Sequence, residues 1–182
     1  VPLPDVITLP LPTFKYHKNP LKTGVIKEET VICDCCGKQS SYKYDGPIHT
    51  SEDIYEICPY CISDGMMYKK YDAQFSDYYR GDVDEKHIKE FLHHNPGYSS
   101  WQTNEVPVHC KDFTEFIGYV GYKEIQEMGI EDELQDQILA HSEELTENVE
   151  KLKEALVNNG QIQGYLFRCL TCKKYLIHLD FT

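Results

Sequence analysis

Four cysteines near the start of the chain have the spacing of a metal site. Cys33 and Cys36, then Cys58 and Cys61, each form a C-x2-C pair, and 21 residues separate the pairs. Thiolate sulfurs bind Zn²⁺ tetrahedrally, and two such pairs supply all four ligands of a closed structural site. The spacing therefore predicts one structural zinc ion at these residues, with disulfide bonds or a redox-active pair as the alternatives. Cys35 is expected to be a buried thiol beside the site.

A third pair, Cys169 and Cys172, lies near the C-terminus between two apolar stretches, residues 164–167 and 174–177. Strand, knuckle and strand in that order are typical of a zinc-ribbon hairpin. Such a hairpin supplies two of the four ligands that a tetrahedral zinc ion needs. The other interpretation is that the pair is simply two thiols in a tight hairpin.

The remaining ligands of this second site are expected elsewhere in the chain. Cys110 is the only cysteine besides Cys35 that is not in a pair, and His109 directly precedes it. We expect both His109 and Cys110 to lie beside the C-terminal hairpin and to complete a second zinc site. His141 and His178 are the alternatives for the fourth ligand.

Composition limits the classes of function. The chain has 182 residues, of which 41% are hydrophobic and 14 are tyrosines, enough for an ordinary domain with a core. Its formal net charge of −12 argues against a general nucleic-acid binder, because Lys and Arg supply most of the affinity for phosphate. No apolar run approaches the about 20 residues of a membrane-spanning helix. No signal peptide is visible either.

Acidic residues are concentrated in one segment. Residues 124–150 contain ten Asp and Glu residues and no Lys or Arg, which accounts for −10 of the net charge. The simplest interpretation is a solvent-exposed helix face. The functional interpretation is a surface for a basic partner, because such a field accelerates association. The acids expected to contact that partner are Glu143, Glu144 and Glu147.

Hydrophobic spacing outlines the elements around these motifs. Four prolines within residues 1–12 exclude a helix there and predict an extended arm. Apolar residues between 131 and 157 recur at helical spacing, which predicts an amphipathic helix that ends before Asn158. Further short elements are expected, namely strands at 42–44 and 54–57 and a helix at 84–93.

The segment Tyr98–Gln102, which reads Tyr-Ser-Ser-Trp-Gln, follows a Pro-Gly turn. Its hydroxyl, amide and aromatic groups could line a ligand groove or a partner-binding surface that includes Trp101. The preferred interpretation is a structural turn with Trp101 as an anchor in the core.

Motifs of common enzymes are absent from the sequence, which contains no G-x-S-x-G, P-loop or H-E-x-x-H. A catalytic zinc ion keeps one coordination position open beside three protein ligands. The first predicted site has four cysteines and is therefore closed. Only an incomplete second site would support zinc catalysis, so an enzyme is the less favoured class.

Several stretches in order along nearly the whole chain resemble the CbrC family of bacterial proteins. The resemblance implies a cytoplasmic protein associated with tolerance to a nuclease colicin, and it brings no catalytic residues. The stretches that carry it are residues 11–17, 33–37, 58–65, 95–102, 109–110, 116–118 and 166–172.

Together these observations predict an α+β protein with a zinc-knuckle module, a helical insertion and a C-terminal zinc-ribbon-like hairpin. The leading function is a non-enzymatic, zinc-stabilised interaction protein, most specifically an immunity or tolerance protein that neutralises a basic nuclease toxin. The alternative is a zinc-dependent enzyme or a nucleic-acid-associated protein. The expected divisions are an extended arm (1–30), a zinc-knuckle core (31–122), an acidic helical insertion (123–160) and a hairpin packed on the core (161–182).

Overall fold

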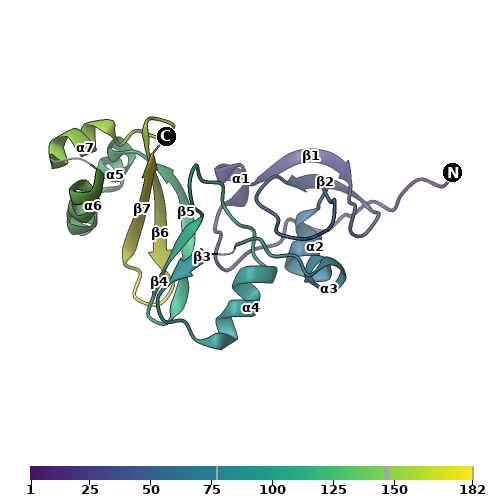
Figure 1. The fold of residues 1–182 in the computed structure, drawn as a ribbon. Coiled ribbons are helices and arrows are strands. Elements are labelled where there is room, and N and C mark those ends of the chain that lie inside the picture. The colour runs from purple at the N-terminus through teal and green to yellow at the C-terminus, as the bar shows by residue number, and fades with distance from the viewer. Residues whose placement is uncertain (77, 146–147, 182) are drawn as a thin grey trace. The chain divides into compact units, whose positions relative to one another are not determined.

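The computed structural model describes residues 1–76, 78–145 and 148–181, and it has the predicted α+β class (Figure 1). The chain divides into two units. The first unit comprises Val1–Asp77 and Asp84–Ser99, and the second comprises Tyr78–Val83 and Ser100–Thr182. This division differs from the expected one, because residues 105–120 form strands beside the C-terminal hairpin and not part of a core around the first cysteines.

The first unit is built around a β-hairpin. Strand β1 (Ile26–Ile32) pairs antiparallel with β2 (Gln39–Tyr44), and the turn between them carries the first cysteine pair. The second expected strand, at 54–57, forms only an isolated bridge between Ile57 and Tyr44. The helices of the unit are α1 (Pro20–Thr23), α2 (Pro59–Ser63), α3 (Met66–Tyr71) and α4 (Glu85–His93).

The N-terminal arm is extended, as its prolines predict. Its Val6 forms a parallel bridge with Gln39, where the Ile7 N–H donates to the Gln39 carbonyl at 2.8 Å and the Gln39 N–H to the Asp5 carbonyl at 2.8 Å. The Tyr60 hydroxyl donates to the Leu9 carbonyl at 2.7 Å. The arm is therefore held against β2 by main-chain hydrogen bonds and against α2 by the Tyr60 side chain.

The second unit contains a five-stranded sheet in the order β3-β4-β5-β6-β7. Strand β3 (Tyr78–Arg80) is parallel to β4 (Glu105–His109), and the other neighbours are antiparallel. The connection from β5 to β6 contains the acidic segment. The remaining elements are β5 (Asp112–Val120), α5 (Tyr122–Met128), α6 (Glu131–Leu145), α7 (Val149–Ala155), β6 (Ile162–Cys169) and β7 (Tyr175–Phe181).

The core of the second unit lies between these helices and one face of the sheet. Leu134 and Ile138 of α6 and Leu152 of α7 are buried with Leu166 of β6 and Ile177 of β7. Alternate residues of the two strands face the helices, as the two-residue period of a strand requires. The apolar spacing in 131–157 therefore marks the buried side of the acidic segment.

The single helix predicted for 131–157 is wrong, because the structure has two helices there. The side-chain oxygen of Asn148 accepts hydrogen bonds from the N–H groups of Glu150 and Lys151 at 2.9 and 3.4 Å, so Asn148 is the N-cap of a new helix. The apolar spacing continues across the break because both helices cover the same sheet.

Helix α6 also covers the free edge of β7. The Tyr175 N–H donates to Glu133 at 2.8 Å, and the Ile177 N–H donates to the side-chain oxygen of Gln137 at 3.0 Å. The Gln137 amide donates in turn to the Tyr175 carbonyl at 3.0 Å. Glu133 and Gln137 are four residues apart and therefore lie on one side of the helix. They satisfy main-chain groups that an edge strand otherwise exposes.

Candidate metal centres

The turn between β1 and β2 is a knuckle that presents Cys33 and Cys36. The Gly37 N–H donates to the Cys33 carbonyl at 2.8 Å, and the Cys33 N–H donates to the Lys38 carbonyl at 2.9 Å. Gly37 has φ +70°, a left-handed conformation that glycine adopts without cost. This turn reverses the chain within a few residues and places both side chains on one side.

The second pair is brought to this knuckle by Asp34 and by α2. The Asp34 carboxylate accepts hydrogen bonds from the N–H groups of Tyr55 and Glu56 at 3.1 and 2.9 Å, and the Asp34 N–H donates to the Glu56 carbonyl at 2.8 Å. Two residues later, Cys58 is the N-cap of α2, and Cys61 lies in the first turn of that helix. The knuckle residue Asp34 thus fixes the segment that leads into the second pair.

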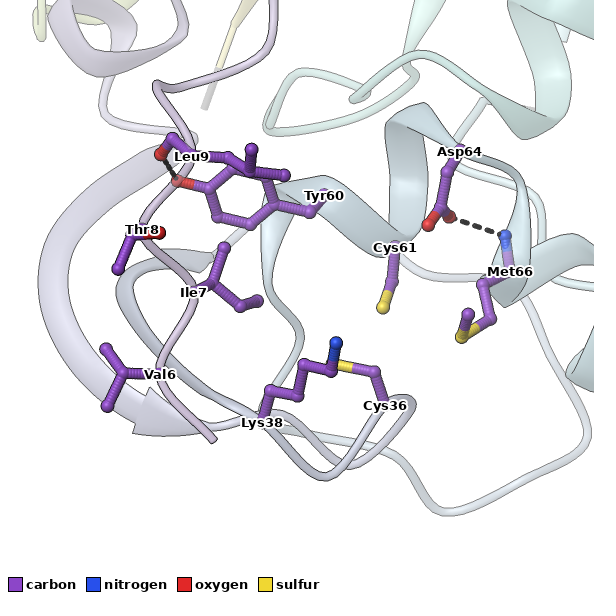
Figure 2. A pocket seen from close by; sticks show the side chains of 10 residues that line it. All are labelled: Val6, Ile7, Thr8, Leu9, Cys36, Lys38, Tyr60, Cys61, Asp64 and Met66. Carbon is purple, nitrogen blue, oxygen red and sulfur yellow. Dashed lines mark hydrogen bonds between the residues drawn. The ribbon is translucent and has the colours of Figure 1, made fainter. Parts of the chain in front are cut away.

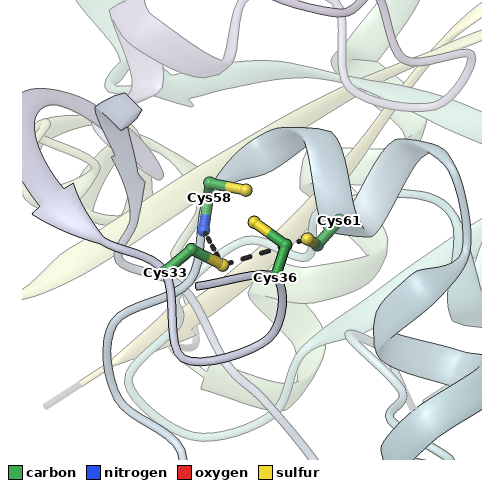
Figure 3. A group of neighbouring side chains, drawn as sticks. All are labelled: Cys33, Cys36, Cys58 and Cys61. Atoms are coloured by element: carbon green, nitrogen blue, oxygen red, sulfur yellow. Dashed lines mark hydrogen bonds between the residues drawn. The ribbon is translucent and has the colours of Figure 1, made fainter. Parts of the chain in front are cut away.

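The four sulfurs converge on one point (Figure 3). All lie within 4.8 Å of one another, and the Cys33 and Cys61 sulfurs are 3.9 Å apart. Four sulfurs about 2.3 Å from one tetrahedral ion are about 3.8 Å apart, whereas a disulfide requires about 2.05 Å. All eight cysteines are free. The cluster therefore has the dimensions of a metal site and not those of disulfide bonds.

The thiols of this first cluster form hydrogen bonds with one another, and these bonds shift their pKa values. Hydrogen bonds with the Cys58 and Cys61 thiols hold the pKa of Cys33 well below its usual range. The same hydrogen bonds to Cys33 raise the pKa of Cys61. The Cys58 N–H also donates to the Cys33 sulfur at 3.4 Å. One thiolate is thus already stabilised, and a bound cation would replace the protons on the others.

A pocket of about 300 Å³ lies beside the first cluster, between the arm, α2 and the knuckle (Figure 2). Cys36 and Cys61 form part of its wall, together with Ile7, Tyr60 and Met66. Of the four ligand candidates only Cys36 is half-buried, and the other three are buried. Solvent therefore reaches the cluster from the side of Cys36.

The second cluster is built by the same local structure as the first. Cys169 ends β6 and Cys172 follows in the turn to β7, where the Lys173 N–H donates to the Cys169 carbonyl at 3.1 Å. The Cys169 N–H donates to the Lys174 carbonyl at 2.8 Å. The Cys33–Cys36 turn has the same two hydrogen bonds at the equivalent positions. The similarity identifies the C-terminal C-x2-C turn as a second knuckle.

The neighbouring hairpin supplies the other two groups. His109 ends β4 and pairs with Asp112 of β5, so Cys110 and Lys111 form a two-residue turn. Thr114 of β5 pairs with Cys169, which puts both turns at the same end of the sheet. The register of β5 with its two neighbours therefore determines which side chains meet.

The His109 ring and the three sulfurs form one cluster. Their ligand atoms lie within 4.8 Å of one another. Nδ1 of His109 is 3.2 Å from the Cys110 sulfur and 3.3 Å from the Cys172 sulfur, so this nitrogen faces the centre. Burial raises the pKa of Cys169, but hydrogen bonds from main-chain N–H groups and His109 lower it to about 6. A thiolate and an imidazole nitrogen are both ligands that Zn²⁺ accepts.

The two alternative histidines do not join this cluster. His141 and His178 lie near each other, with ring centroids 6.3 Å apart, and the His178 ring stacks on Tyr165. Among the described residues, the only groups that bring three or more potential ligands together are the two cysteine clusters. Each cluster could hold one metal ion with four ligands.

The chain matches the sequence model of the uncharacterised protein family UPF0167 over residues 11–181. It belongs to the UPF0167 family. It is 35% identical over 176 residues to the UPF0167 protein Mb2317 of Mycobacterium bovis, with 94% of each chain covered. It is also 35% identical over 178 residues to the UPF0167 protein PA1536 of Pseudomonas aeruginosa, which covers 95% of this chain and 98% of the relative. No solved structure matches the chain.

These matches correct the resemblance to the CbrC family. The matched family and these relatives carry the UPF0167 name, and none of them carries the CbrC name. The link to colicin tolerance therefore loses the support that the resemblance supplied. A search of the described helices finds none that is both long enough and apolar enough to cross a membrane.

Two further groups of predicted site residues lie outside the metal centres. Trp101 is 44% exposed, so its predicted role as a core anchor is wrong, and Tyr98 fills the core at that turn instead. Glu143 is exposed on α6. Glu147 and the side chain of Glu144 lie outside the described residues.

The loop at Trp101 depends on a carboxylate that was not predicted from the sequence. Asp180 of β7 accepts hydrogen bonds from the N–H groups of Trp101 and Gln102 at 3.2 and 3.1 Å, and from the Tyr165 hydroxyl at 2.8 Å. Asp180 is buried, and these contacts compensate its desolvation. The only signal was the presence of an acid within the apolar strand Tyr175–Phe181.

Proposed function

We propose that this protein binds two zinc ions as structural elements and acts by binding a protein partner, without catalysing a reaction. The observation that carries the proposal is the completeness of both clusters. Each offers four Cys or His ligand atoms within 4.8 Å of one another. Three or four thiolates with at most one imidazole are a donor set typical of structural Zn²⁺.

The same completeness favours a structural over a catalytic role. A catalytic zinc ion keeps a position for water or substrate, and four protein ligands occupy that position. The second cluster was the one that could have been open, but His109 and Cys110 lie close enough to act as its third and fourth ligands. A zinc-dependent enzyme is therefore the less supported alternative.

A partner of positive charge is supported by α6. Asp132, Asp136 and Glu143 are exposed, and their spacing of four and seven residues places them on one side of the helix. Leu139, 45% exposed, lies on the same side. We refer to these four residues as the acidic stripe. A partner that fits it presents Lys or Arg around an apolar contact.

The partner's identity rests on charge alone. A basic nuclease toxin domain has the required chemistry, and an immunity protein would use such a stripe to bind it. With the CbrC resemblance corrected, the net charge of −12 and the stripe are what supports this more specific proposal. Exposed Trp101 is a second candidate contact, because Trp is enriched among residues that dominate binding energy.

The metal content is the first test. Elemental analysis of protein purified without added metal should find about two zinc atoms per chain. Substituting Cys58→Ser should remove one zinc and unfold the first unit, whose core contains that cluster. Cys169→Ser should remove the other zinc. A folded chain without zinc, or one that holds another metal, would contradict the proposal.

The partner surface needs a charge-matched comparison. The double reversal Asp136→Lys and Glu143→Lys should slow association with a partner and reduce the salt dependence of its on-rate. The control reverses Glu28 and Glu52, two exposed acids of the first unit, and so changes the net charge equally. Equal effects of both variants would show that the total charge matters and the stripe does not.

A further inference from the structure

The two metal clusters differ in how far solvent reaches their sulfurs. In the first cluster three of the four cysteines are buried and Cys36 is half-buried. In the second, Cys110 and Cys172 are both exposed, His109 is half-buried, and only Cys169 is buried. The second cluster therefore presents two neighbouring, accessible thiols to solvent, whereas the first presents at most one.

The turn that carries Cys110 is under backbone strain. Cys110 and Lys111 have φ +51° and +60°, so both central residues of this two-residue turn are left-handed. Such turns favour Gly, Asn or Asp at both positions, and a left-handed conformation costs about 1 kcal/mol or more for other residues. The Lys173 position of the second knuckle has the same cost, with φ +66°. Strain of this kind is typical of functional sites.

The residues that flank the exposed thiols are basic. Lys111 follows Cys110 directly, and Lys173 and Lys174 follow Cys172. Oxidants attack cysteines that solvent reaches, and both of these thiols are exposed. The charge of Lys111 is partly offset by Asp82, whose carboxylate lies 3.9 Å from its ammonium group.

We propose that Cys110 and Cys172 form an oxidation site, at which hydrogen peroxide joins them in a disulfide and releases the second zinc ion. The inference rests on the proposed function, because it requires zinc at this cluster. The first cluster keeps its zinc under the same conditions, since burial protects its sulfurs.

The chemistry balances with peroxide as the oxidant. One thiolate attacks peroxide, the O–O bond breaks, and a sulfenic acid and hydroxide form. The second thiolate attacks that sulfur, forms the S–S bond and displaces hydroxide. Two protons from solvent convert both hydroxides to water. The two sulfurs lose two electrons, which peroxide gains. Zinc then retains only His109 and Cys169 and dissociates.

The structural consequence is confined to one end of the five-stranded sheet. The zinc ion joins the β4–β5 turn to the β6–β7 turn, and the disulfide replaces that connection with a shorter one between Cys110 and Cys172. The order of the surface at this end of the sheet would thus depend on oxidation.

The test uses the purified, zinc-loaded protein with a few molar equivalents of hydrogen peroxide and a chromogenic zinc chelator. The expected result is rapid release of about one zinc per chain, slow release of the other, and a disulfide between Cys110 and Cys172 in peptide mass mapping. Release of both ions at one rate, no release, or a disulfide confined to the first cluster would overturn the proposal.

A histidine substitution separates oxidation from loss of a ligand. Cys110→His retains four ligands but leaves only one exposed thiol, so it should bind zinc and release it at least about tenfold more slowly. The matched variant, Cys36→His in the first cluster, should release the second zinc at the wild-type rate. If the untreated wild-type protein carries two zinc ions but peroxide leaves both bound, this inference fails and the structural role stands. If the second zinc is absent at the outset, the proposed function itself fails.

Discussion

Lys173 and Gly37 occupy the same position in the two knuckles, each directly after the second cysteine of its pair, with φ +66° and +70°. Glycine adopts this conformation without cost, whereas a lysine pays about 1 kcal/mol. The second knuckle therefore keeps the geometry of the first at the expense of stability. Strain at Lys173 is a direct consequence of the metal-site turn and not of the surrounding sheet.

Lys173→Gly should therefore raise the free energy of unfolding of the second unit by about 0.5 kcal/mol. The gain is less than the strain, because glycine also adds freedom to the unfolded chain. Gly37→Ala should lower the stability of the first unit by about 1 kcal/mol through strain alone, since an added Cβ meets nothing within 4 Å. Denaturant titration of zinc-loaded protein measures both, and effects of the opposite sign would refute the shared geometry.

Cys35 provides a control for the ligand assignment of the first cluster. It is buried beside the four ligand candidates but is not among them, and burial raises the pKa of its thiol. Cys35→Ala should keep two zinc ions per chain and lose about 1 kcal/mol from packing. Cys58→Ser should lose one zinc ion and make the first unit sensitive to protease. Loss of zinc from Cys35→Ala would place this thiol in the coordination sphere.

The sequence indicated which cysteines gather more clearly than it indicated where the chain divides, and the reason is physical. A C-x2-C turn is local, because its hydrogen bonds lie within six residues, so spacing alone indicates it. The partners of Cys169 depend on the register of β5 with β6, a long-range property. His109 and Cys110 were nevertheless identified, because few other soft ligands were left in the chain. The amino-acid composition does not change at residue 99, where the first unit ends, so it did not indicate the boundary between the units.

The predicted helix over 131–157 fails for a different reason. Hydrophobic spacing reports which residues face a common surface, and α6 and α7 both face the sheet, so the pattern continues across their break. The capping residue Asn148 was the signal for a new helix. The prediction for Trp101 fails because the size of an aromatic side chain does not determine its burial. Trp101 is exposed in its turn, and the nearby Tyr98 is buried in the core.

Replacing Gln137 should lower the free energy of unfolding more than replacing an ordinary exposed glutamine. Its amide bonds both the Ile177 N–H and the Tyr175 carbonyl on the edge of β7. Gln137→Ala should cost about 1–3 kcal/mol and expose the edge to pairing between chains. The control is Gln135→Ala, an exposed position on the same helix, which should change stability by less than about 0.5 kcal/mol. Denaturation midpoints and light scattering measure both effects. Equal stability of the two variants would show that the edge contacts contribute nothing.

His17 should make the first unit sensitive to acid. The side chain is buried, with Nδ1 3.3 Å from the Pro96 carbonyl and Nε2 2.7 Å from the Thr23 hydroxyl. The Thr23 hydroxyl also donates to the Pro20 carbonyl at 3.2 Å, so the His17 ring lies in a closed hydrogen-bond network. Burial lowers the pKa of His17 to about 4, although hydrogen bonds to the Pro96 and Gly97 carbonyls oppose the shift.

The sign of the pH effect follows from that pKa. Between about pH 6.5 and pH 4 the unfolded chain binds a proton at His17 that the folded chain does not bind, so stability falls as the pH falls through this window. The full effect is about 3 kcal/mol at 1.36 kcal/mol per pKa unit. Acid also displaces zinc from thiolates, so the measurement must be a difference between wild type and His17→Gln, in which metal loss cancels. The variant should be less stable at pH 7 and should approach the wild type near pH 4. Parallel stability profiles for the two proteins across that range would show that His17 does not titrate between the folded and unfolded states.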